Sequence, residues 1–276
     1  MNEFAIGGDL PVRRLGFGAM RLPTESGPAR ESAIAVARRA VEIGITLIDT
    51  AHLYGWGANE ELLAEALYPY PDDLVITTKV GVVRTGDDWT YDARPESLRV
   101  QVDEGLRRLR VERIELLQLH RLDPETPLTD QLGALRDLRD EGKIGRIGLS
   151  EVSVDELARA RGIVDIASVQ NRYSLVDREY EAVLEACEAA GIAFLPWRPV
   201  LGAASSATAG ITAVADELGV TTAQVGLAWL LARSPVILPI PGTAKISHLE
   251  ENFAAASITL TAEHLKRLGS LGSLGS

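Results

Sequence analysis

Short apolar runs, many of them rich in β-branched residues, alternate with longer segments of helical period along almost the whole chain. The runs at 74–80, 114–120 and 236–242 are nearly continuous hydrophobes, as expected for parallel strands covered on both faces. Successive runs start 22 to 43 residues apart, near Leu15, Thr46, Leu74, Ile114, Arg146, Ser168, Ala193 and Val236. Eight strand–helix units in one unbroken series predict an α/β protein, a closed (β/α)8 TIM barrel.

The segments between the runs have helical patterns with recognisable ends. Residues 94–109 and 177–190 each present one apolar stripe, and Cys187 lies in the second stripe as an expected core residue. Residues 208–233 read as two helices broken at 219–221, and Gly142, Gly191 and Gly219 fall at expected helix ends.

No linker or change in composition divides the 276 residues, so one barrel domain is expected over 1–268. A short hairpin turned at 7–9 is expected within residues 4–14, ahead of the first barrel strand. Residues 269–276 belong to a Leu-Gly-Ser repeat and are expected to form a flexible tail without a function.

The charge balance narrows the class of partner. The formal net charge is −11 and the sequence pI is about 5.0, which favours solubility and argues against a general nucleic-acid binder. A single cysteine excludes an intrachain disulfide and suits a reducing, cytoplasmic location. The chain starts without a signal-type apolar core and has no apolar stretch near the ~20 residues of a membrane span, so no membrane partner is expected.

Polar side chains follow three consecutive expected strands. Asp49 ends the second strand and Tyr54 lies in the next loop, whereas Lys79 ends the third strand and His120 the fourth. Asn59, just after that loop, reads as a helix N-cap. Because the carboxyl ends of barrel strands share one rim, we expect the four residues to meet there.

These residue types suit the protonation of a carbonyl oxygen. A phenol has a reference pKa near 10 and holds its proton at neutral pH, while a nearby ammonium eases proton donation by stabilising the phenolate. Asp49 can hold Lys79 charged, and His120 can hydrogen-bond the carbonyl oxygen. The set lacks an electron source, which predicts a nicotinamide cofactor as hydride donor.

With these residues in place, the sequence resembles the aldo-keto reductase family over nearly its whole length. The motifs that carry the resemblance are Leu-Gly-Phe-Gly-Ala-Met from residue 15, Leu-Ile-Asp-Thr-Ala-His-Leu-Tyr-Gly from 47, Thr-Lys-Val from 78, Leu-Leu-Gln-Leu-His from 116, Val-Gln-Asn-Arg-Tyr from 169 and Ile-Pro-Gly-Thr from 240. The resemblance implies a catalytic tetrad of Asp49, Tyr54, Lys79 and His120.

The resemblance also implies a cofactor site. Ser150 and Gln170 match the residues that bind the nicotinamide carboxamide, Glu151 stands where the family usually has Asn, and Trp197 would stack on the ring. The full implied set is Met20, Arg21, Ser150, Glu151, Gln170, Trp197, Arg198, Pro199, Gly242, Thr243, Lys245, His248, Glu251 and Asn252.

The cofactor is expected to be NADPH rather than NADH. Gly242 and His248 replace a Lys and an Arg that clamp the 2′-phosphate in many relatives, and Lys245 supplies a cation nearby. The start of the following helix suits the phosphates.

The expected substrate is a small carbonyl compound. Met20, Trp56, Trp89 and Trp197 would line a pocket for an aromatic or otherwise apolar aldehyde, and the short C-terminus implies broad specificity. The pattern is similar to bacterial members that include pyridoxal reductases, so pyridoxal is a candidate substrate. A monomer or weak homo-oligomer is expected.

Two other classes of function compete with this interpretation. A metal-dependent barrel hydrolase could use Asp49, His52 and His120 as ligands, but it would leave Tyr54 without a role. A barrel that binds the cofactor without turnover, as a regulatory subunit, is the non-enzymatic alternative. The intact tetrad favours the reductase, and no metal is expected.

Overall fold

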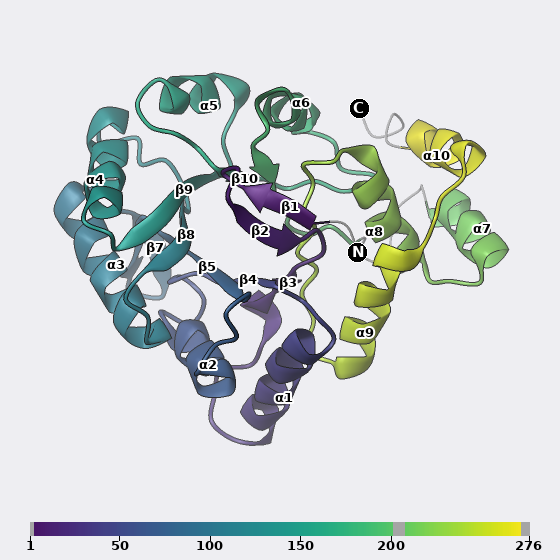
Figure 1. The fold of residues 1–276 in the computed structure, drawn as a ribbon, viewed down its shortest axis with the longest axis horizontal. Coiled ribbons are helices and arrows are strands. Elements are labelled where there is room, and N and C mark those ends of the chain that lie inside the picture. The colour runs from purple at the N-terminus through teal and green to yellow at the C-terminus, as the bar shows by residue number, and fades with distance from the viewer. Residues whose placement is uncertain (1–2, 201–207, 272–276) are drawn as a thin grey trace.

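Parallel strands form a curved sheet at the centre of the molecule, with helices around it (Figure 1). The computed structural model describes residues 3–200 and 208–271. The seven strands of the sheet lie in the order β11-β10-β9-β8-β5-β4-β3. Their bounds are β3 Phe17–Gly18, β4 Leu47–Asp49, β5 Val75–Val80, β8 Ile114–Leu119, β9 Ile144–Ser150, β10 Ser168–Gln170 and β11 Ala193–Phe194.

Residues 236–241 close the sheet into a barrel. On one side the backbone N–H of Leu238 donates to the carbonyl of Phe194 at 2.8 Å. On the other side the N–H of Gly16 donates to the carbonyl of Pro239 at 2.9 Å, and that of Gly18 to Pro241 at 3.2 Å. The segment occupies the eighth position without forming a regular strand because proline has no N–H to donate. The predicted (β/α)8 barrel is therefore present.

Helices follow the strands as the sequence pattern predicts. Their bounds are α1 Pro28–Glu42, α2 Ala58–Leu67, α3 Pro95–Leu109, α4 Leu128–Asp140, α5 Val154–Arg161, α6 Glu181–Ala190, α7 Thr208–Leu218, α8 Thr222–Arg233, α9 Ile246–Ala254 and α10 Ala262–Gly269, with short 3-10 turns η1 Ala19–Arg21 and η2 Ala255–Ser257. In α1, for example, the buried residues Ala33, Val36, Ala37 and Ala40 recur at helical spacing and form one apolar stripe.

The expected helix ends and core residue are found. The break between α7 and α8 falls at Gly219, and Gly191 caps α6 with a φ of 67°. Cys187 on α6 is fully buried, and burial raises the pKa of its thiol to about 12. Cys187 is thus an inert core residue rather than a nucleophile.

A hairpin of β1 Glu3–Ile6 and β2 Leu10–Arg13 crosses one opening of the barrel (Figure 1). Its turn uses Gly7 and Gly8, both with positive φ. The buried Ile6 and Val12 of the hairpin share a core cluster with Leu47 of β4 and Leu116 of β8. The hairpin therefore plugs one end of the barrel interior.

The C-terminal part of the chain packs on the barrel up to residue 271. Gly269 is the last residue of α10, and Leu271 is packed against the core. The rest of the expected Leu-Gly-Ser tail, 272–276, lies outside the described residues. Among the helices that the structure describes, none is long and apolar enough to cross a membrane.

Candidate active site

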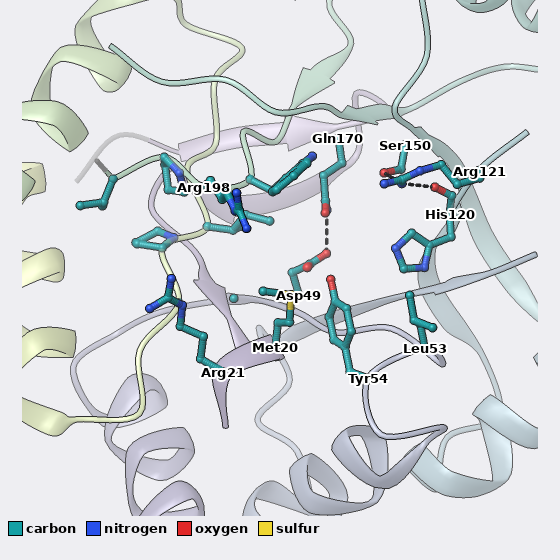
Figure 2. Close-up of a pocket in the computed structure, with 17 residues that line it drawn as sticks. Met20, Arg21, Asp49, Leu53, Tyr54, His120, Arg121, Ser150, Gln170 and Arg198 are labelled. Atoms are coloured by element: carbon teal, nitrogen blue, oxygen red, sulfur yellow. Dashed lines mark hydrogen bonds between the residues drawn. The ribbon is translucent and has the colours of Figure 1, made fainter. Parts of the chain in front are cut away.

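Asp49, Lys79 and His120 meet at the carboxyl ends of neighbouring strands β4, β5 and β8. Figure 2 shows Asp49 and His120 at this rim together with Tyr54. The ammonium of Lys79 donates to both carboxylate oxygens of Asp49, at 2.8 and 2.7 Å, and to the carbonyl of Thr50 at 2.8 Å. The Tyr54 hydroxyl lies 3.4 Å from the same ammonium. The four residues of the expected tetrad are thus brought together.

The Asp49–Lys79 pair is removed from water, with Lys79 fully buried and Asp49 3% exposed. Burial opposes the charge on Lys79, but Asp49 and Tyr54 outweigh it and hold the pKa of Lys79 above its ordinary value. Burial raises the pKa of Tyr54, and the positive charge of Lys79 partly offsets this rise. Tyr54 therefore keeps its proton at neutral pH, and the ammonium of Lys79 lies next to its hydroxyl oxygen.

His120 is held neutral next to Tyr54. Burial lowers the pKa of His120 well below its ordinary value, and the positive charges of Lys79 and Arg121 lower it further. The two rings stand edge to face with centroids 6.2 Å apart. The Nδ1 atom of His120 is buried without a hydrogen-bond partner among the described residues. A neutral imidazole has one N–H to donate, so His120 can act as a hydrogen-bond donor beside the phenol.

The loop that carries Tyr54 is fixed by Asn59, which the sequence suggested as a helix N-cap. That prediction is wrong: α2 begins at Ala58 after Gly57, whose φ is 94°. Asn59 is instead buried, accepting from the Thr50 hydroxyl at 2.6 Å and donating to the carbonyl of Ala19 at 3.0 Å. Its side chain ties both ends of the loop to the barrel.

A second set of contacts lies behind this loop. Arg108 of α3 pairs with the buried Glu60 at 2.7 Å and lies 3.0 Å from the Nδ1 atom of His52. Glu60 also accepts from the hydroxyl of Thr78 at 2.6 Å. This network was not expected, since nothing in the separation of these residues along the chain indicates that they meet.

Two glutamines orient Asp49. The amide of Gln170 donates to Oδ1 of Asp49 at 2.8 Å, and the amide of Gln118 donates to the same atom at 3.3 Å. Gln170 was expected in the cofactor site, whereas Gln118 was not singled out. Gln118 could have been recognised from its position in β8, two residues before His120, because residues two apart in a strand have their side chains on the same face.

The tetrad opens into a cavity of about 460 Å³. Its lining includes part of the expected cofactor and substrate set, namely Met20, Arg21, Ser150, Gln170, Trp197, Arg198, Pro199 and Gly242. It also includes Leu53, Arg121, Val200, Gly18, Ile240 and Pro241, which were not among the expected site residues. Arg121 directly follows His120, and no motif of the sequence indicated that it lines the same cavity.

Glu151 lies outside the cavity lining and holds one of its walls. Its carboxylate accepts from the indole N–H of Trp197 at 2.6 Å and from the backbone N–H of Arg172 at 2.8 Å. The Tyr180 hydroxyl donates to its other oxygen at 3.3 Å. The positive φ of Glu151, 56°, turns the chain at the end of β9. Glu151 therefore contacts Trp197 where a cofactor contact was expected.

The remaining expected cofactor residues lie around the start of α9, beyond the cavity lining. Thr243 is buried, Lys245 is the exposed N-cap of α9 and His248 is exposed in its first turn. Glu251 accepts from the hydroxyl of Thr221 at 2.7 Å, and Asn252 is buried on α9.

Two of the tryptophans expected in the substrate pocket lie elsewhere. Trp89 is 37% exposed in a hairpin of β6 Val82–Thr85 and β7 Asp88–Tyr91, with its ring against Tyr91. Trp56 packs edge to face on His52, with centroids 5.9 Å apart. Trp56 and Trp89 are not among the described residues that line the cavity. Of the residues expected in the substrate pocket, Met20 and Trp197 do line it. Over 3–200 and 208–271, no group of three or more His, Cys, Asp or Glu is placed to hold a metal ion.

Comparison with known proteins assigns the family. Residues 14–272 match the family model described as "Aldo/keto reductase family". The chain belongs to the aldo/keto reductase family. It is therefore an oxidoreductase, as its motifs had indicated.

Individual relatives cover almost the whole aldo/keto reductase chain. An uncharacterised oxidoreductase of Schizosaccharomyces pombe is 46% identical over 96% of this chain and 88% of its own length. Pyridoxine 4-dehydrogenase of Escherichia coli is 38% identical over 97% of each chain, which supports the expected similarity to pyridoxal-reducing members. A crystal structure of an aldo/keto reductase from Klebsiella pneumoniae, in complex with NADP and acetate, has a TM-score of 0.84 at 28% identity, covering 98% of this chain and 94% of that one.

Proposed function

We propose that this aldo/keto reductase uses NADPH to reduce aldehydes and ketones to alcohols, with Tyr54 as the general acid. The observation that carries the proposal is the Tyr54 hydroxyl, which lines the cavity 3.4 Å from the buried ammonium of Lys79. The Klebsiella pneumoniae relative in complex with NADP supports the choice of cofactor.

Tyr54 and Lys79 handle the proton. When the carbonyl carbon gains a hydride, negative charge develops on its oxygen, and Tyr54 donates its proton to that oxygen. The phenolate left behind is stabilised by the ammonium of Lys79, which Asp49 keeps charged and in place. Because burial raises the pKa of Tyr54, the acid is in its protonated form before the reaction begins.

His120 orients the substrate. As a neutral imidazole it can donate one hydrogen bond to the carbonyl oxygen, which brings that oxygen towards the Tyr54 hydroxyl. A neutral ring also leaves the proton transfer to the phenol, so Tyr54 rather than His120 acts as the acid.

The lining of the cavity fits a nicotinamide cofactor. Bound NADPH supplies the hydride. Trp197 offers a flat face for the ring, Ser150 and Gln170 offer polar groups for its carboxamide, and the guanidiniums of Arg21 and Arg198 suit phosphates. Lys245 and His248 at the start of α9 would hold the adenosine end.

Pyridoxal is the first named substrate to test. The E. coli relative named pyridoxine 4-dehydrogenase is similar over 97% of both chains, which favours this aldehyde among possible substrates. Narrow specificity for pyridoxal and broad aldehyde reduction are then distinguished by a panel.

The deciding experiment is the consumption of NADPH with 4-nitrobenzaldehyde, methylglyoxal and pyridoxal, repeated with NADH. Aldehyde-dependent oxidation that is faster with NADPH is the expected result. If NADPH quenches the tryptophan fluorescence but no carbonyl compound is turned over, the reductase proposal fails in favour of a regulatory barrel that only binds the cofactor.

A further inference from the structure

Three guanidiniums line the cavity of this acidic protein. They belong to Arg21, Arg121 and Arg198, and the one carboxylate in the lining is that of Asp49, which the ammonium of Lys79 neutralises. The chain as a whole has a net charge of −11. The cavity is therefore a local positive region, which concentrates anions at the reaction centre.

The three arginines are divided between two ends of the cavity. In Figure 2, Arg21 and Arg198 lie on one side of Tyr54, and Arg121 lies on the other side, next to His120 and Ser150. On the proposed function, the phosphates of the cofactor account for the first two. Arg121 then stands on the side of His120, the residue that would orient the substrate carbonyl.

The described contacts of Arg121 use only part of its hydrogen-bonding capacity. Its Nη1 donates to the backbone carbonyl of His120 at 2.6 Å and to the Ser150 hydroxyl at 3.2 Å. Among the described residues, no Asp or Glu carboxylate lies within 4.0 Å of the Arg121 guanidinium, the limit for an ion pair. The remaining residues, 1–2, 201–207 and 272–276, contain no Asp or Glu. A guanidinium has five N–H donors, so the Nε and Nη2 groups remain for a ligand.

A purely structural role does not explain a charge at this place. Tying the end of β8 to Ser150 of β9 needs a hydrogen-bond donor, which a neutral amide could supply. A half-buried guanidinium without a counter-ion is unfavourable, because its solvation is lost without compensation. Figure 2 places Arg121 next to His120, and its positive charge also lowers the pKa of His120.

We propose that Arg121 selects carbonyl substrates that also carry an oxyanion, a carboxylate or a phosphate. The planar fork of the guanidinium can bind two oxygens of such a group and fix the carbonyl against Tyr54 and His120. The oxyanion itself is unchanged in the reaction, in which only the carbonyl carbon takes up hydride and its oxygen a proton. Arg121 is thus a specificity-determining residue.

The test compares charged and neutral aldehydes of similar shape. With NADPH, kcat/KM is measured for 4-formylbenzoate against its methyl ester, and for pyridoxal 5′-phosphate against pyridoxal. Removing one hydrogen bond between charged groups predicts that Arg121→Gln lowers kcat/KM for the charged aldehydes by about 10- to 100-fold and for the neutral ones by a smaller factor.

Arg113→Gln is the matched control. Arg113 precedes the other end of the same strand, β8, pairs with Glu115 at 2.7 Å and has a side chain 55% exposed. The substitution Arg113→Gln also removes one arginine charge, but at the end of the strand far from the cavity. The ratio of kcat/KM for charged aldehydes to kcat/KM for neutral aldehydes should therefore stay at the wild-type value. The two aldehyde pairs show whether carboxylate, phosphate or both are accepted.

Three outcomes would overturn the proposal. One is a charged-to-neutral ratio that Arg121→Gln leaves unchanged for both pairs, and another is a loss of NADPH affinity in that variant large enough to make Arg121 a cofactor ligand. If wild-type protein reduces no aldehyde, the proposed function fails by itself, and calorimetry of 4-(hydroxymethyl)benzoate binding to protein with NADP+ tests Arg121 separately. The third outcome is equal affinity of wild type and Arg121→Gln for 4-(hydroxymethyl)benzoate in that experiment.

Discussion

At the scale of single residues, Tyr54 is the group on which turnover depends most directly. Tyr54→Phe removes the hydroxyl 3.4 Å from Lys79 and keeps the ring that packs against His120. A positioned general acid contributes about 10²- to 10⁴-fold, so kcat for NADPH-dependent aldehyde reduction should fall by that factor. Affinity for NADPH, followed by fluorescence quenching, should change little, and a variant that kept most of its kcat would show that another group supplies the proton.

Glu151 offers a second prediction at this scale. Glu151→Ala removes the acceptor that holds the indole of Trp197, and a hydrogen bond to a charged group contributes about 1.5 kcal/mol, so NADPH should bind roughly tenfold more weakly. Glu151→Gln keeps an acceptor oxygen and should restore most of the affinity. Equal NADPH dissociation constants for wild type and the Ala variant would mean that Trp197 holds its position without this contact.

At the scale of elements, the loop between β4 and α2 depends on space at Gly57. A methyl group there would lie 2.5 Å from Nε of Arg108, so Gly57→Ala should displace Arg108 or shift the loop that carries Tyr54. We expect a loss of stability, seen as a lower urea midpoint, together with a lower kcat. Gly8→Ala is the control, because Gly8 also has positive φ but nothing lies within 4 Å of an added methyl. If both variants kept the kcat of wild type, the loop would be able to absorb the change.

The N-terminal hairpin should contribute to stability without contributing to chemistry. Ile6 is fully buried in the cluster at the hairpin end of the barrel, away from the carboxyl ends of the strands. Ile6→Ala should reduce the free energy of unfolding by about 2–5 kcal/mol, as large-to-small core substitutions do, and leave kcat unchanged. Leu10→Ala, at a partly buried position of the same hairpin, should cost less. A kcat that fell in proportion to the lost stability would indicate coupling between the two ends of the barrel.

At the scale of the whole molecule, the buried His120 and the half-buried His52 should make stability depend on pH. Burial lowers the pKa of both His120 and His52, so below about pH 6.5 the unfolded chain binds more protons than the folded one. Stability must therefore fall as the pH drops below that value, by up to about 1.4 kcal/mol per pH unit for each group.

Urea unfolding between pH 5 and pH 7 measures this dependence. His120→Asn should flatten the decline, whereas the same change at the exposed His248 should leave it as in the wild type. An identical decline in wild type and His120→Asn would mean that His120 takes up its proton in the folded state as readily as in the unfolded chain.

The sequence predicted the barrel and the tetrad because both follow from short-range pattern. Apolar runs of strand length reveal where strands end, and a parallel barrel brings those ends together, so Asp49, Lys79 and His120 could be placed without coordinates. Side-chain direction is not encoded in that pattern. The positive φ of Glu151 turns it towards Trp197, and the positive φ of Trp56 accompanies its packing on His52. Arg108 contacts Glu60 and His52, and Arg121 contacts Ser150 of the neighbouring strand β9. Spacing along the chain does not reveal such contacts.

The seam between Gly16–Gly18 and residues 236–241 gives the molecule a built-in order of assembly. Its two sides are more than 200 residues apart, so a nascent chain has to extend through residues 236–241 before the barrel can shut. Gly18, Ile240, Pro241 and Gly242 on the seam also line the cavity. A protein stalled or truncated before this point would contain all four tetrad residues and yet lack Ile240, Pro241 and Gly242 of the cavity lining. On the proposed function, binding of the nucleotide would therefore report that the seam has closed.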